Sequence, residues 1–138
     1  MVEKAILNIL ENDAGLVALH GTRVFALVAN QNTARPYMVF HRAPSQDRHD
    51  VQAIQPAELN EGTYEITVVA DSYFSAKTVA EELRLSFSRR TGTFAGVTIQ
   101  AIFFVDEFDD YQLVVNGGES YFYTVTTVWR IAFNETTS

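Results

Sequence analysis

The sequence contains no cysteine among its 138 residues. This absence excludes a disulfide framework, a thiolate metal site and a cysteine nucleophile. Long apolar runs are also missing, because none approaches the roughly 20 residues that a membrane-spanning helix needs. Residues 1–4 lack the charged-then-apolar layout of a signal peptide. We therefore expect synthesis in the cytoplasm and no membrane partner.

Basic residues are scarce as well. Lys and Arg number 10 against 17 Asp and Glu, which gives a formal net charge of -7. Tight, sequence-independent binding to nucleic acid depends on cations that neutralise phosphates, so a DNA-binding protein is disfavoured. An acidic wall that lets DNA pass without holding it is compatible with this charge. Excess negative charge is also a common means of keeping a protein soluble.

Signatures of catalysis are missing too. The three histidines, His20, His41 and His49, lie in different local settings, and none is paired with a ligand-spaced carboxylate on a helix. No phosphate-binding loop, nucleophile elbow or metalloprotease motif is present. The sequence therefore predicts a protein that is not an enzyme and that has no cofactor and no metal site.

Two segments show helical periodicity. Residues 2–11 place apolar side chains on one side, and residues 72–88 place Val79, Leu83 and Phe87 at i, i+4 and i+8 after a run of N-capping side chains. Between them, residues 16–19 could form a short second turn. Three arginines gather near the end of the longer helix, where cations meet the negative end of its dipole: Arg84, Arg89 and Arg90.

Other segments alternate as strands do. In residues 64–70 and 121–133, apolar side chains share one parity and polar ones the other, which favours antiparallel pairing with one face on the core. We therefore predict a single α+β domain over residues 1–138, with a mostly antiparallel sheet and two amphipathic helices packed on one face. Long loops are expected at about residues 43–61 and 106–120.

An alternative for the second loop is a hairpin. Residues 112–115 would then be strand, and residues 116–119, which begin Asn-Gly, would turn the chain into the closing strand. Such a hairpin would project from the sheet and could lay its edge against a neighbour by strand addition.

The order of two segments resembles a known family. After the first helix, the sequence reads Gly-Thr-Arg-Val-Phe over residues 21–25 and then Arg-Pro-Tyr-Met-Val-Phe over residues 35–40. This order is similar to that of the siphophage tail-completion or tail-terminator family, minor tail proteins that close the tail tube at the head-tail junction. The similarity continues through the helix at residues 72–88 and the Trp-containing closing strand. The connection over residues 43–61 is longer than the family pattern.

The resemblance implies a structural protein of the virion from a phage or prophage. A family member would act as the tail terminator, a ring of identical subunits, six by the family pattern, that caps the tail tube and forms the interface for head-tail joining. The implied partners are further copies of the chain, the tail tube protein and the head-tail connector protein, while DNA passes through the lumen. A neighbouring head-tail joining or tail-tube component is one alternative, and a small-ligand-binding α+β domain is the alternative from a different class.

A ring needs a contact in which one surface of each subunit meets a different surface of the next. The two loops and Phe122, an aromatic residue at a polar position of its strand, are the interface candidates. The candidate residues are Arg48, Val51, Ile54, Asp106, Glu107, Asp109, Asp110, Leu113, Val115 and Phe122. The four acidic residues lack the spacing of a calcium loop, although a weak cation could relieve their repulsion around a ring.

Overall fold

The computed structural model describes residues 1–21, 23–30, 33–44, 59–88, 90–115 and 119–135. Its elements are α1 (Val2–Asn12), α2 (Ala14–His20), β1 (Val24–Ala26), β2 (Tyr37–Arg42), β3 (Asn60–Ala70), α3 (Tyr73–Phe87), β4 (Gly92–Phe94), β5 (Val97–Val115) and β6 (Glu119–Glu135). The six strands form one sheet in the order β1-β2-β3-β6-β5-β4. The α+β class is confirmed, but the sheet is mixed.

The exception to antiparallel pairing is β1. It runs parallel to β2, with Val24 opposite Met38, whereas β2–β3, β3–β6, β5–β6 and β4–β5 are all antiparallel. Parallel neighbours require the chain to return to the end from which it started. The connection between β1 and β2 does so and delivers the chain into β2 at Tyr37. A strand of three residues is too short to show this direction in its pattern.

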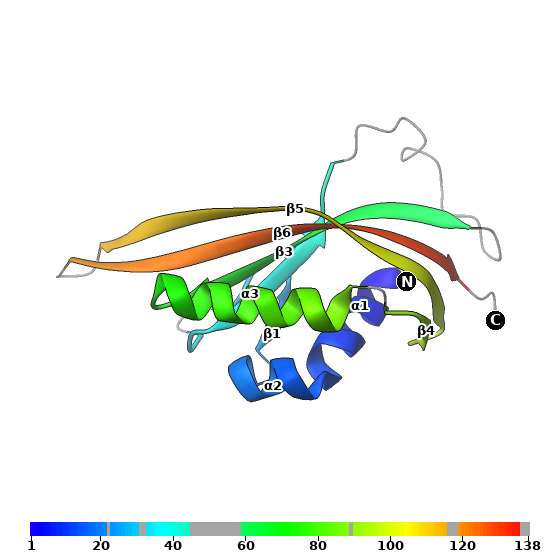
Figure 1. Ribbon diagram of the computed structural model, residues 1–138, viewed down its shortest axis with the longest axis horizontal. Coiled ribbons are helices and arrows are strands. Elements are labelled where there is room, and N and C mark those ends of the chain that lie inside the picture. The colour runs from blue at the N-terminus through cyan, green and yellow to red at the C-terminus, as the bar shows by residue number, and fades with distance from the viewer. Residues whose placement is uncertain (22, 31–32, 45–58, 89, 116–118, 136–138) are drawn as a thin grey trace.

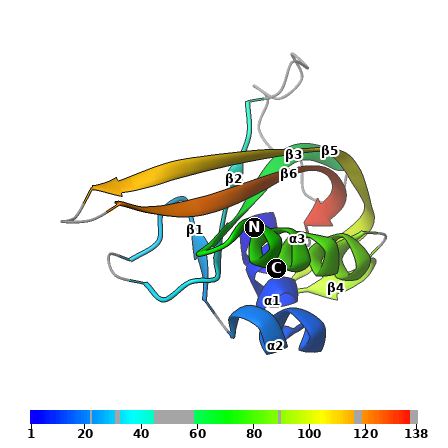
Figure 2. The same cartoon turned by 60° about the vertical axis from the view of Figure 1, so that its left-hand side comes forward.

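Three helices, not two, lie on one side of the sheet, α1 and α3 against the strands and α2 against α1 and α3, and the other face carries no helix among the described residues (Figures 1 and 2). The additional helix is α2, where the sequence suggested only a turn. Its N-cap is Asp13, whose carboxylate accepts a hydrogen bond of 3.0 Å from the amide of Leu16. That bond satisfies one of the free amides of a helix N-terminus and lets a second helix start directly after α1.

The core lies between the helices and the sheet. The predicted alternation of β3 is confirmed, because Tyr64, Ile66 and Val68 are all fully buried on the helix side. At the centre, the ring of Trp129 meets Phe87 of α3 at 5.1 Å between centroids, in an edge-to-face arrangement. Helix α3 is therefore anchored on β6 by aromatic packing.

The predicted loop at residues 106–120 is wrong, and the hairpin alternative is correct. Strand β5 continues to Val115 and pairs with β6 along its whole length, so that Asp106 lies opposite Val128 and Leu113 opposite Tyr121. The register shifts between Phe104 and Asp106, which interrupts the alternation that marks a strand. The turn expected over residues 116–118 lies outside the described residues, as does most of the loop expected over residues 43–61.

The end of this hairpin extends beyond the helices, at the left of Figure 1 and again at the left of Figure 2. Strand β3 pairs with β6 only as far as Tyr123, and β4 pairs with β5 only as far as Ile99. Among the described residues, both edges of the distal hairpin therefore lack a strand partner. Unpaired edges of this kind are templates for contact with another chain.

Candidate assembly surface

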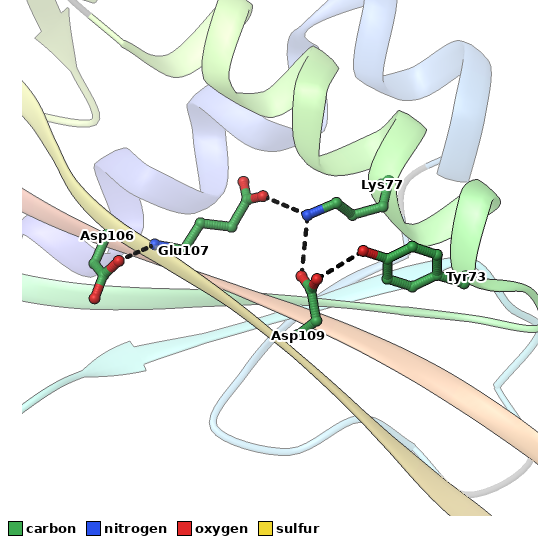
Figure 3. A network of polar contacts seen from close by, with 5 residues as sticks. All are labelled: Tyr73, Lys77, Asp106, Glu107 and Asp109. Carbon is green, nitrogen blue, oxygen red and sulfur yellow. Dashed lines mark hydrogen bonds and ion pairs between the residues drawn. The ribbon is translucent and has the colours of Figure 1, made fainter.

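The base of the projecting hairpin is tied to α3 by a polar network (Figure 3). The Lys77 ammonium on α3 donates to the carboxylate of Glu107 at 2.8 Å and to that of Asp109 at 3.0 Å. One helical turn earlier, the Tyr73 hydroxyl donates to the other oxygen of Asp109 at 2.7 Å. We call these four residues the clamp, because they join a helix of the body to the strand that leaves it.

Electrostatics keep Lys77 and Asp109 charged at neutral pH. The hydrogen bond to Glu107 is the largest cause that raises the pKa of the Lys77 ammonium. The hydrogen bond from Tyr73 is the largest cause that lowers the pKa of the Asp109 carboxyl, and Lys77 acts in the same direction. The same bond to Asp109 raises the pKa of the Tyr73 hydroxyl. Charge-assisted hydrogen bonds of this kind are stronger than neutral ones.

The predicted acidic group is divided between the two faces of β5. Glu107 and Asp109 lie opposite Thr127 and Val125, on the face covered by α3. Asp106 and Asp110 lie on the other face, where each side chain accepts a hydrogen bond of 2.8 Å from the backbone amide of the next residue. No group of three or more acidic or histidine side chains within the described ranges is placed to hold a metal ion.

The distal hairpin exposes large apolar side chains. Tyr111, the most exposed at 63%, packs edge-to-face against Tyr121 at 5.8 Å between ring centroids, and Leu113 lies opposite Tyr121 in the strand pairing. Phe108, nearer the body where β3 still pairs with β6, is 49% exposed on the other face of β5. A cluster of exposed aromatic side chains is characteristic of a contact surface. Leu113 is 49% exposed, and its part in a subunit contact stays a prediction.

Phe122 lies at the base of the hairpin and is half-buried. The guanidinium of Arg35 sits over its ring, 5.6 Å from the centroid, and Arg35 also pairs with Asp71 beyond the end of β3. The structure thus gives this residue a partner within its own chain. Part of its ring remains accessible for contact with another chain.

The structure says little about the remaining interface candidates. Arg48, Val51 and Ile54 lie outside the described residues, and Val115 is placed only as the last residue of β5. None of the helices in the described part of the chain is long and apolar enough to cross a membrane.

A second surface was not predicted from the sequence. A cleft of about 470 Å³ lies between the end of α3 and β5, lined by Ser88, Thr91 and residues 100–104. It adjoins a hollow of about 350 Å³ lined by Glu81, Arg84, Leu85, Ser88 and Phe104. The Arg84 guanidinium lies over the Phe104 ring, 4.2 Å from its centroid. We call the cleft and the hollow together the α3–β5 cleft.

One signal in the sequence marks this region in retrospect. Residues 100–105 carry no charge, and the next five residues, 106–110, include four carboxylates. The side chain of Leu85 also departs from the pattern of α3, since it is 74% exposed on the polar side of the helix. Apolar side chains at polar positions are the usual trace of a contact in a sequence.

Taken together, the described surfaces have the chemistry of protein contact and include no arrangement of nucleophile, base and oxyanion donors. The fold and these surfaces define a small α+β assembly protein. The sequence matches the family described as Tail completion protein gp17 over residues 4–113, and the chain belongs to this family. It is therefore a structural component of the virion tail.

The fold recurs in a solved particle. A chain from the "Virion of native gene transfer agent (GTA) particle" superposes with a TM-score of 0.64 at 19% identity, over 94% of this chain and 91% of that chain. At this identity the similarity establishes a shared fold. No match was found among the curated proteins.

Proposed function

We propose that the protein is the tail terminator, which forms a hexameric ring of identical subunits at the end of the tail tube and presents the surface for head-tail joining. The observation that carries this proposal is the β5–β6 hairpin, which leaves the body with unpaired edges and exposed aromatic side chains. In an isolated subunit the exposed aromatic side chains of this hairpin have no partner surface in the described part of the chain. In a ring, each hairpin reaches the next subunit.

Two further observations support the proposal. A chain with the same fold is part of a gene transfer agent virion, which is where a tail component would be found. The net charge of -7 suits a lumen through which DNA slides without being held. The tail tube protein on one side and the head-tail connector protein on the other would be the neighbours of such a ring.

Native mass spectrometry of the purified protein over a concentration series, with and without magnesium, tests the oligomer. We expect hexamers, either in solution or after the addition of tail tubes assembled from the tail tube protein. Electron microscopy of those tubes should show one added ring at a single end. Binding along the whole tube would instead identify a tube component, and binding only to the connector would identify a neighbouring joining protein.

A further inference from the structure

We infer that the α3–β5 cleft of one subunit receives the base of the β5–β6 hairpin of a second copy of this chain, with Phe108 in the cleft and Asp110 against Arg84. The inference rests on the proposed ring and specifies which two surfaces form its contact. Because the hairpin and the cleft are different surfaces of one chain, the contact is head-to-tail, as a closed ring requires.

The cleft is open because the sheet loses a strand there. Strand β4 pairs with β5 from Val97 to Ile99 and no further, so residues 100–105 form an edge without a strand partner among the described residues. Exposed edges in monomeric proteins usually carry charged side chains or proline, which prevent association. This segment carries neither, and its Phe103 is more than half exposed. This edge therefore lacks the residues that usually prevent association with another chain.

Charge decides which partner fits. Arg84 has no carboxylate partner among the described residues, although it lies at the cleft between Glu81 and Phe104. Four of the seven other described Lys and Arg side chains are paired with carboxylates within the chain: Lys77 in the clamp, Arg90 with Asp13, Arg35 with Asp71 and Arg130 with Glu61. An unpaired guanidinium next to the apolar side chains of Leu85 and Phe104 favours a partner with an acidic group next to an apolar one.

The hairpin supplies that combination. Phe108 and Asp110 are two residues apart on the same face of β5, and both are exposed. Asp110 has no cationic partner within the described part of the chain. Arg84 and Asp110 of the same chain lie on opposite faces of β5, so they do not pair with each other. Arg84 lies over Phe104 on the face that α3 covers, whereas Asp110 lies on the other face. A second copy can bring the two together.

Net charge strengthens the argument. Two copies that each carry a charge of -7 repel one another, so a stable contact must be uncharged or must pair opposite charges. The α3–β5 cleft offers an uncharged edge and an available cation, and the hairpin offers an aromatic anchor and a carboxylate. Buried aromatic anchors with a paired charge are typical of the residues that dominate binding energy.

Charge reversal tests the pairing. Arg84→Glu and Asp110→Arg should each weaken ring formation, raising the concentration of half-assembly by at least about tenfold, as expected for the loss of a charge pair at an interface. The double variant, with both changes in one chain, should regain most of the parental assembly. Both residues are exposed, so each variant should keep the parental melting temperature.

Cysteine cross-linking gives an independent readout, since the chain has no cysteine of its own. One tagged copy carries Leu85→Cys and an untagged copy carries Phe108→Cys, and the mixture is oxidised at concentrations where rings are present. We expect a disulfide-linked heterodimer. The matched control replaces Phe108→Cys with Leu27→Cys, an exposed leucine beside β1, and should give no enriched link.

The outcomes separate the two proposals. Rings that persist in every charge variant and show no link between residues 85 and 108 overturn this inference and leave the terminator proposal intact. A link from residue 85 to the tail tube protein would assign the cleft to that partner and also overturn the inference. The absence of any oligomer, both in solution and on tail tubes, overturns the proposed ring and this contact with it.

Discussion

The ammonium of Lys77 lies 2.8 Å from the carboxylate of Glu107, and this contact joins the main helix to the strand that leaves the body as a hairpin. The position of this contact matters more for the hairpin than its contribution to the free energy of unfolding. Strand β4 ends before this contact, at Ile99 of β5, and β3 ends beyond it, at Tyr123 of β6, so the last part of the hairpin depends on pairing between its own two strands. A two-stranded hairpin alone is marginally stable in water, so the clamp should set how rigidly the hairpin is presented.

Replacement of Lys77 by methionine should loosen the hairpin without unfolding the body. Methionine keeps the helix propensity and the length of the side chain but loses the contacts to Glu107 and Asp109. Because the pair is partly exposed, the free energy of unfolding should fall by no more than about 1 kcal/mol. Hydrogen exchange should nevertheless quicken at the amides of residues 106–113 and 121–124.

Lys4→Met is the control, since Lys4 is an exposed lysine on α1, away from the hairpin. It should leave the exchange of both hairpin segments at the parental rate. Equal exchange in the Lys77 variant and the control would show that strand pairing alone holds the hairpin.

The periodic elements could be predicted from the sequence because each buries one face. Residues such as Val79 and Leu83 on α3, and Ile66 and Val68 on β3, are buried as their spacing requires. Helix α1 and the body of β6 follow the same rule. These elements contact the core directly, so their patterns record it.

The distal half of β5 could not be predicted as strand with the same certainty, for two physical reasons. The register shift between Phe104 and Asp106 breaks the alternation where the acidic residues begin. Beyond it none of the described side chains of β5 is buried in the core, so this strand shows no hydrophobic face. Only the Asn-Gly sequence at residues 116–117 indicated a hairpin.

The candidate site was harder to predict from the sequence than the strands, because its contacts join residues that are far apart in the chain. Nothing local pairs Lys77 with Glu107, thirty residues later in the chain, or places Arg84 over Phe104. The sequence assigned Arg84 to the helix dipole and grouped Glu107 and Asp109 with Asp106 and Asp110. The fold separates these four carboxylates onto two faces, and only the outward pair is left without a partner on α3.

Phe122→Glu should stop assembly while the monomer stays folded, if Phe122 is a subunit contact. The charged side chain would remove the ring that stacks under Arg35 and place a further negative charge at the base of the hairpin. Native mass spectrometry would report assembly and circular dichroism would report folding. Phe122→Tyr is the matched control, because it keeps the ring and should assemble normally. Unfolding of the Phe122→Glu variant would instead place Phe122 in the core.

Thr127→Val should destabilise the protein by about 2 kcal/mol, although it removes no volume from the core. The buried Thr127 hydroxyl donates to the carbonyl of Ile66 at 2.9 Å and accepts the indole N–H of Trp129 at 2.7 Å. Valine would leave that indole N–H buried without a partner. Denaturant unfolding followed by the fluorescence of Trp129, the single tryptophan, measures the change.

Thr124→Val on the same strand is the comparison, since Thr124 is only half-buried. Its free energy of unfolding should stay within about 0.5 kcal/mol of the parent. A Thr127 variant as stable as the Thr124 variant would show that the network at Trp129 contributes little.

Mild acid should destabilise the protein through His20. This residue at the end of α2 is fully buried, and neither ring nitrogen has a hydrogen-bond partner within the described part of the chain. Burial is the largest cause that lowers its pKa below the ordinary 6.5. The folded state therefore holds His20 neutral, while the unfolded chain takes up a proton below about pH 6.5. Stability is fully present above that pH and is lost as the pH falls below it.

His20→Leu should remove this part of the acid sensitivity, because leucine fills a similar volume and binds no proton. Thermal unfolding of both proteins from about pH 5 to pH 8 gives the contribution of His20 as the difference between the two curves, since the carboxylates titrate in both. Parallel curves for the parent and His20→Leu would mean that the imidazole binds its proton equally well in the folded and unfolded states.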